Sequence, residues 1–213
     1  MIRWLTIAIV VLTGTTISWA DIIGVQTNYV LGTKFDTEFL DLDFDENGTV
    51  DFQLYAGGFA STAGIQQAGE NRYLIHPSPP PNIGGAVAGL SAGFDIGLYL
   101  ESNSSEDWFK HDGWATLIQI LYPTITGEFY QNRAFIGFEF ESEDGVHYGW
   151  LEVEGATSSF ENHLIGESSL IIHGFAYEST PGVSIVAGAV PEPASIFLFM
   201  IGAWGTWLLR KNR

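Results

Sequence analysis

A two-residue period of apolar side chains is the feature of this sequence that most limits its fold. The alternation runs through residues 134–141 and 146–153, on either side of the turn-forming segment 142–145. A period of two places successive side chains on opposite faces of an extended chain, so the two segments predict a β-hairpin. The same pattern recurs at 39–44 and 50–55, and no window shows the period of a long amphipathic helix.

These segments predict an all-β domain. About ten short strands, separated by turns at near-regular spacing, are typical of an antiparallel β-sandwich of jelly-roll or concanavalin-like type. Residues 57–69 are rich in small side chains and are expected to form a loop. Residues 21–187 suffice for a single domain with its own core. Because the chain contains no cysteine, the stability of that domain must come from core burial rather than from disulfides, and bound metal is considered as an additional source.

The charge of the chain restricts its partners. The net charge is −17, and Lys34, Arg72, Lys110 and Arg133 are the only cations between residues 21 and 190. So acidic a domain repels nucleic acid and anionic lipid surfaces, whereas divalent cations and neutral sugars are compatible with it. We therefore expect no nucleic-acid partner, and we consider Ca²⁺ and extracellular polysaccharide as ligands.

The first twenty residues predict a secretory signal peptide. Arg3 precedes an apolar segment at 4–12, a polar stretch follows, and Ser18 and Ala20 stand before Asp21. Small residues at these two positions fit the cleavage site of signal peptidase, so we expect cleavage after Ala20. Residues 21 onward would then lie outside the cytoplasmic membrane.

The C-terminal segment 188–213 predicts a membrane anchor preceded by an extended motif. Sixteen uncharged residues at 194–209 would form a helix of roughly 24 Å, just long enough for a thin bilayer. The basic end at 210–213 fixes that terminus in the cytoplasm by the positive-inside rule. Two prolines keep the segment around Glu192 extended. The motif consists of Pro191, Glu192 and Pro193, and the cytoplasmic stop consists of Arg210, Lys211 and Arg213.

This order of motif, apolar helix and basic end resembles the PEP-CTERM sorting signal of Gram-negative bacteria. The resemblance covers the tail alone. It implies that an exosortase-like membrane protease removes the tail, and that the mature protein is cell-surface or extracellular. It also implies a structural or binding role in the exopolysaccharide matrix. We expect the domain to have no catalytic activity. A plain C-terminal anchor, whose prolines only end the helix, is the alternative.

Residues 43–51 predict a calcium loop. The sequence D-x-D-x-N-G-x-x-D resembles the first nine positions of an EF-hand loop, in which oxygen ligands surround Ca²⁺ and a glycine makes the turn. Leu54 replaces the glutamate that would complete that loop, and the flanking strands are typical of calcium-binding hairpin loops instead. A metal-free acidic turn is the alternative. The expected ligands are Asp43, Asp45, Asn47, Thr49 and Asp51, with the fourth contributing its backbone carbonyl.

Three further carboxylates at spacing two, Glu139, Glu141 and Glu143, allow a second hypothesis. A pair of carboxylates can hydrolyse glycosidic bonds, so a secreted glycan-active hydrolase using Glu139 and Glu141 is the alternative function. We favour solvent-facing acids opposite a core of Ile136, Phe138 and Phe140, and we predict no catalytic residue. A calcium-dependent lectin or adhesin is the third possibility, and a shallow face lined by aromatic residues would favour binding over catalysis.

Overall fold

A computed structural model describes residues 21–32, 36–57, 62–76, 86–97, 107–109, 114–121, 124–158 and 167–190. The predicted signal peptide, the 191–193 motif and the predicted helix 194–209 lie outside these residues. Within the described ranges, no helix is long and apolar enough to cross a membrane.

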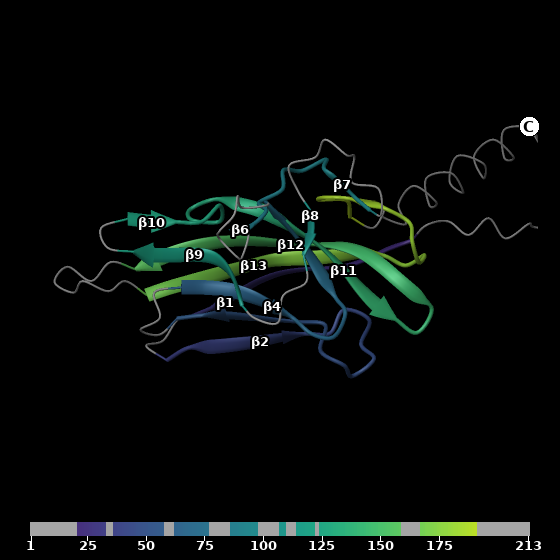
Figure 1. The fold of residues 1–213 in the computed structure, drawn as a ribbon, viewed down its shortest axis with the longest axis horizontal. Helices are drawn as coiled ribbons and strands as arrows, with labels where there is room; N and C mark the ends of the chain where they lie inside the picture. Colours follow the sequence, from purple (N-terminus) through teal and green to yellow (C-terminus); the bar gives the residue numbers. More distant parts are fainter. Residues whose placement is uncertain are drawn as a thin grey trace, which may run out of the picture.

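The described residues form antiparallel strands and no helix, which confirms the predicted all-β class. We call the larger sheet sheet A and the second one sheet B (Figure 1). Sheet A has the order β1 (Ile22–Leu31), β13 (Glu167–Glu178), β12 (Gly145–Ser158), β11 (Arg133–Ser142), β5 (Arg72–His76) and β6 (Ala86–Val87), with β8 (Asp107–Phe109) also paired to β5. Sheet B has the order β10 (Thr124–Thr126), β9 (Ala115–Leu121), β4 (Thr62–Gln67), β3 (Phe52–Ala56) and β2 (Glu38–Leu42). The predicted hairpin is β11–β12, with Ser142 opposite Gly145.

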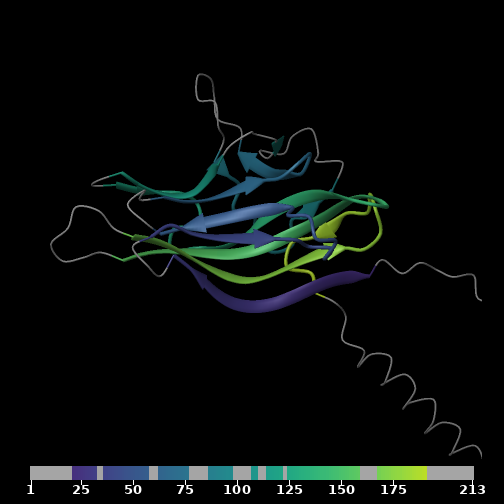
Figure 2. The ribbon, with the colours of Figure 1, turned by 90° about the horizontal axis from the view of Figure 1, so that it is seen from below.

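The two sheets enclose one apolar core, the arrangement that a β-sandwich requires. Alternate residues of the central strands β11 and β3 point into it, as the period of two predicts. Aromatic rings occupy its centre: Phe138 on β11 lies 5.6 Å from Phe52 on β3, measured between ring centroids. Figure 2 shows the layers edge-on, with β1 at the outside of the molecule. The jelly-roll or concanavalin-like subdivision stays a prediction.

A second apolar cluster covers the opposite face of sheet A. Trp150 on β12 meets Phe135 edge to face at 5.3 Å, and its indole nitrogen donates to the carbonyl of Ala189 at 3.1 Å. The covering segments include the two-stranded sheet of β7 (Asp95–Ile96) and β14 (Ile185–Val186). The middle of sheet A is therefore buried on both faces, whereas the outer face of sheet B carries exposed or half-buried side chains.

Two predictions for individual segments were wrong. Residues 57–69, expected to form a loop, contain β4, which pairs with β3 and β9. The side chains of Ala63 and Ile65 on this strand point into the core. Glu139 was expected to face solvent, but it is only 4% exposed, since the second apolar cluster covers its side of the sheet. The inward positions Ile136, Phe138 and Phe140 are buried as predicted.

Candidate metal centre

The acidic loop at residues 43–51 connects β2 to β3, whose pairing begins at Leu42 and Phe52. Side-chain oxygens close the loop on itself: Asp43 accepts hydrogen bonds from the backbone nitrogens of Gly48, at 2.8 Å, and Asn47, at 3.1 Å. Gly48 has a φ of 87°, a conformation that glycine adopts without steric cost. Aspartate and asparagine favour such local turns, so the sequence itself dictates this compact loop.

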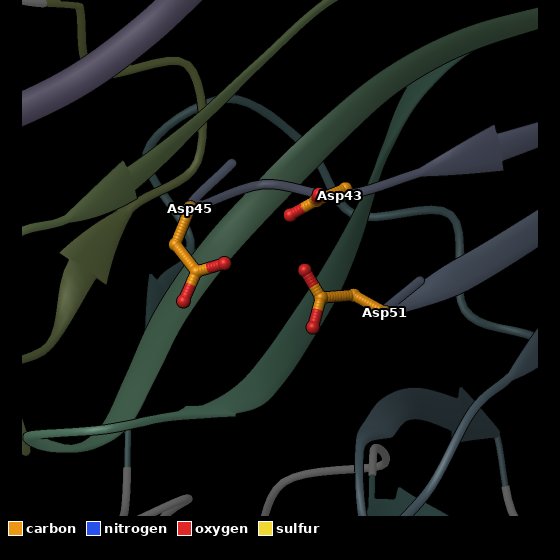
Figure 3. A group of neighbouring side chains, drawn as sticks. All are labelled: Asp43, Asp45 and Asp51. Atoms are coloured by element: carbon orange, nitrogen blue, oxygen red, sulfur yellow. The ribbon is translucent and has the colours of Figure 1, made fainter. Parts of the chain in front are cut away.

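Three of the five predicted ligands come together in this loop. Asp43, Asp45 and Asp51 each offer one carboxylate oxygen, and these oxygens all lie within 4.8 Å of one another. Figure 3 shows the three carboxylates directed into a common space. Oxygens on opposite sides of a Ca²⁺ ion, each about 2.4 Å from it, would be about 4.8 Å apart. The spacing of the three groups therefore fits one ion of this size.

Hydrogen bonds to the rest of the fold fix two of the three carboxylates. Asp51 is 3% exposed, and its two oxygens accept from the backbone nitrogen of Phe44 at 2.8 Å and from the side-chain amide of Asn71 at 3.1 Å. Asp45 accepts from the Ser142 hydroxyl at 2.6 Å. Because Ser142 ends β11, this bond joins the loop to sheet A. The acidic groups are thus held in place before any ligand binds.

The electrostatics of the cluster are unfavourable for three bare charges. Burial raises the pKa of Asp51 to about 6, and the charges of Asp45 and Asp43 add to the increase, against the hydrogen bonds from Phe44 and Asn71. Partial burial raises the pKa of Asp45, but the hydrogen bonds from Ser142 and Asn47 together outweigh it, so the pKa is lowered overall. A bound cation would remove the penalty for ionising Asp51.

The other two predicted ligands, Asn47 and Thr49, take a different part in the loop. The Asn47 amide donates to Asp45 at 3.0 Å, and its oxygen accepts from the backbone nitrogen of Thr49 at 2.7 Å. Both residues are exposed. In this arrangement the Asn47 side chain braces the turn, and the three aspartates supply the clustered charge.

A polar pocket of about 270 Å³ lies beside the loop. Asp51 lines it together with Glu141 and Glu143 from the β11–β12 hairpin. These two glutamates place further carboxylates beside the candidate metal site. Sequence reasoning placed them on one strand face but could not connect them to a loop about ninety residues earlier. Ser142, which lies between them, makes the hydrogen bond that connects this hairpin to the acidic loop. Nothing in its sequence context predicts that bond.

The carboxylate of Glu139, one half of the alternative catalytic pair, is held in an ion pair. The Arg72 side chain donates to it through Nε, and Arg72 in turn lies 5.8 Å from the ring centroid of Trp108. Burial raises the pKa of Glu139, while the guanidinium of Arg72 opposes the increase. Glu141, by contrast, is exposed. The ion pair with Arg72 therefore accounts for the buried position of Glu139 without a catalytic role.

Comparison with known families identifies the C-terminal segment. The PEP-CTERM protein-sorting motif matches residues 189–213. The chain carries a PEP-CTERM sorting motif. This motif implies recognition by an exosortase, export and sorting to the cell surface in Gram-negative bacteria. No curated protein and no solved structure matches the chain. The comparison thus establishes how the protein is sorted and assigns no activity to the β domain.

The raised pKa of Asp51 predicts an unusual pH dependence of stability in calcium-free buffer. The folded protein binds the Asp51 proton more tightly than the unfolded chain does, where the pKa is about 3.8. The stabilisation from this proton is complete below pH 4 and is lost as pH rises through 6, by up to roughly 3 kcal/mol. Urea unfolding at pH 4 to 7 should show this decrease in the wild type but not in Asp51→Asn.

The matched control is Asp36→Asn, which removes an exposed carboxyl group outside the cluster. It should keep the pH profile of the wild type. The comparison uses the slope with pH, because Asp51→Asn also loses one hydrogen-bond acceptor and changes absolute stability. Parallel profiles for the wild type and Asp51→Asn would contradict the assignment.

Proposed function

We propose that the exported β domain is a non-catalytic structural or binding component of the extracellular polysaccharide matrix. The observation that carries the proposal is the direct attachment of the sorting motif to the folded domain. The matched segment begins at Ala189, whose carbonyl accepts the hydrogen bond from Trp150 and whose nitrogen donates to Val186 at 2.9 Å. The whole sandwich is therefore the cargo that the motif delivers.

The matrix role predicts where the mature protein is found. In the native host it should co-fractionate with extracellular polysaccharide, and a strain unable to make that polysaccharide should release it into the medium. Quantitative immunoblots of cell, matrix and medium fractions measure this distribution. An unrelated exported protein of similar size and acidity provides the control. Equal release from both strains would contradict the proposal.

The tail supports a transient attachment. Its Pro191-Glu192-Pro193 motif precedes an apolar segment barely long enough to span a bilayer. The cations Arg210, Lys211 and Arg213 would stay in the cytoplasm and so hold the motif at a fixed height above the outer face of the cytoplasmic membrane. An exosortase-like protease would cut at or beside the motif. Cleavage then releases the domain or joins it to a surface acceptor.

This model predicts that mature protein from the native host lacks the apolar segment and the basic end. Mass spectrometry of its C-terminus should show cleavage at or near residues 191–193. Glu192→Ala should slow cleavage, because it removes the one charge available for recognition, whereas the control Asp36→Ala should be cleaved normally. Insertion of residues after Pro193 should slow cleavage through geometry alone. A main species ending in Arg213 would show a permanent anchor.

A structural Ca²⁺ ion in the 43–51 loop belongs to the same proposal. The three converging aspartates, all hard oxygen donors at a spacing that fits one ion, support it. They also favour calcium dependence for the lectin or adhesin alternative. The hydrolase alternative gains no comparable support, because Glu139 is engaged by Arg72.

Calcium should stabilise the mature protein against unfolding. At a concentration one hundred times its dissociation constant, the gain is about 2.7 kcal/mol, measurable as a rise in melting temperature. Asp45→Asn and Asp51→Asn should reduce the rise, and Asp36→Asn should leave it intact. The same melting temperature in calcium and in chelator would rule out the site.

A further inference from the structure

Three aromatic side chains form a cluster on the outer face of sheet B. Phe39 on β2 is 56% exposed, Trp114 just before β9 is 41% exposed, and Tyr55 on β3 is half-buried and in contact with both. The ring centroid of Tyr55 lies 4.5 Å from that of Trp114 and 6.5 Å from that of Phe39, and the centroids of Phe39 and Trp114 are 5.8 Å apart, so the three rings form a triangle. We call Phe39, Tyr55 and Trp114 the aromatic face.

The sheet itself positions these rings. Phe39 and Tyr55 are directly opposite each other on adjacent strands, and Tyr55 is opposite Gly64 on β4. A Cβ atom at Gly64 would lie 2.3 Å from the backbone oxygen of Ala115 and 2.5 Å from the Tyr55 ring, so glycine allows both the close approach of β9 and the position of the ring across β4. The Tyr55 hydroxyl then donates to the Thr62 hydroxyl at 3.3 Å. Strand pairing, a glycine and a hydrogen bond thus build the aromatic face.

The aromatic face has no partner within the described fold. Sheet B packs its other face into the core, through Phe52 and Leu54. Exposing three large neighbouring rings to water is unfavourable, and a ligand that covered them would gain the free energy of burying their apolar surface. The three ring planes are tilted, at 36° to 73° to one another, which makes the surface uneven. An uneven surface can contact a flexible polymer chain more closely than it can contact a flat crystalline surface.

The polar groups around the rings define the chemistry of that ligand. Asp41 accepts a hydrogen bond from the Gln53 amide next to the rings, and Gln66 lies opposite Gln53 on the neighbouring strand. Among the described residues, β2, β3 and β4 carry no lysine or arginine. Amides, hydroxyls and a carboxylate bind hydroxyl groups well, and an acidic domain repels anions.

From these contacts we propose that the aromatic face binds a neutral polysaccharide chain. The apolar C–H faces of pyranose rings would pack on Phe39, Tyr55 and Trp114, while sugar hydroxyls would bond to Asp41 and Gln53. The inference rests on the proposed matrix function and adds the ligand class and the site. A second copy of this chain is a poorer occupant, because each copy carries a net charge of −17.

Affinity electrophoresis of the mature protein tests the site with defined probes: a mixed-linkage β-glucan, a galactomannan, a dextran and, as an anionic control, alginate. At least one neutral polysaccharide should retard the wild type, and alginate should not. Phe39→Ala and Trp114→Ala should each weaken the retardation about five- to tenfold. Tyr29→Ala, which removes an aromatic side chain of similar exposure (47%) from β1, should bind as the wild type does.

Thermal melts establish that each variant is folded, and Trp114→Phe should restore part of the binding because it keeps an aromatic ring. Absence of retardation by every neutral probe, or equal retardation of the wild type and both alanine variants, overturns the inference. Self-association that the alanine variants abolish, without glycan binding, also overturns it and assigns the face to a second copy.

The fractionation of cells, matrix and medium tests the proposed matrix function independently of this binding assay. A wild type that stays in the matrix without binding these probes would contradict the aromatic face alone. A wild type that binds them but is released from the matrix would contradict the matrix role alone.

Discussion

The buried ring of Phe44 is the contact on which the candidate metal centre depends. This residue stands between Asp43 and Asp45, and its ring stacks on Phe138 of sheet A, with centroids 4.2 Å apart and planes 2° apart. It also lies 4.9 Å from the ring of Phe175. Burying the ring forces both neighbouring carboxylates outward, and the backbone nitrogen of Phe44 donates to Asp51. One aromatic anchor thereby fixes three acidic groups that repel one another.

The sequence predicts features that depend on local rules and misses those that depend on the second layer. Alternation found the β11–β12 hairpin, and the spacing of aspartate, asparagine and glycine found the 43–51 loop. Glu139 was misplaced because alternation tells which face a residue occupies but not whether another layer covers that face. The strand β4 was missed because Gly64 opposes strand propensity, and its pairing on both sides outweighs that preference.

The unequal covering of the two sheets separates stability from recognition. Sheet A is buried on both faces around Trp150, and the domain has no disulfide to add to that burial. Sheet B is needed for the core on one face only, so residues on its outer face can vary without opening the interior. A binding surface can therefore occupy that face, where Gly64 leaves room for both the Tyr55 ring and the backbone of the neighbouring strand.

The same asymmetry sets the direction in which the aromatic face points. The sorting motif begins at Ala189, which packs on the outer face of sheet A beside Trp150. Phe39 and Trp114 lie on the outer face of sheet B, with both sheets between them and that point. A domain held by its C-terminal end therefore presents the aromatic face away from the attachment. Under the proposed anchoring by the tail, this orientation would leave the proposed glycan site accessible to chains outside the cell.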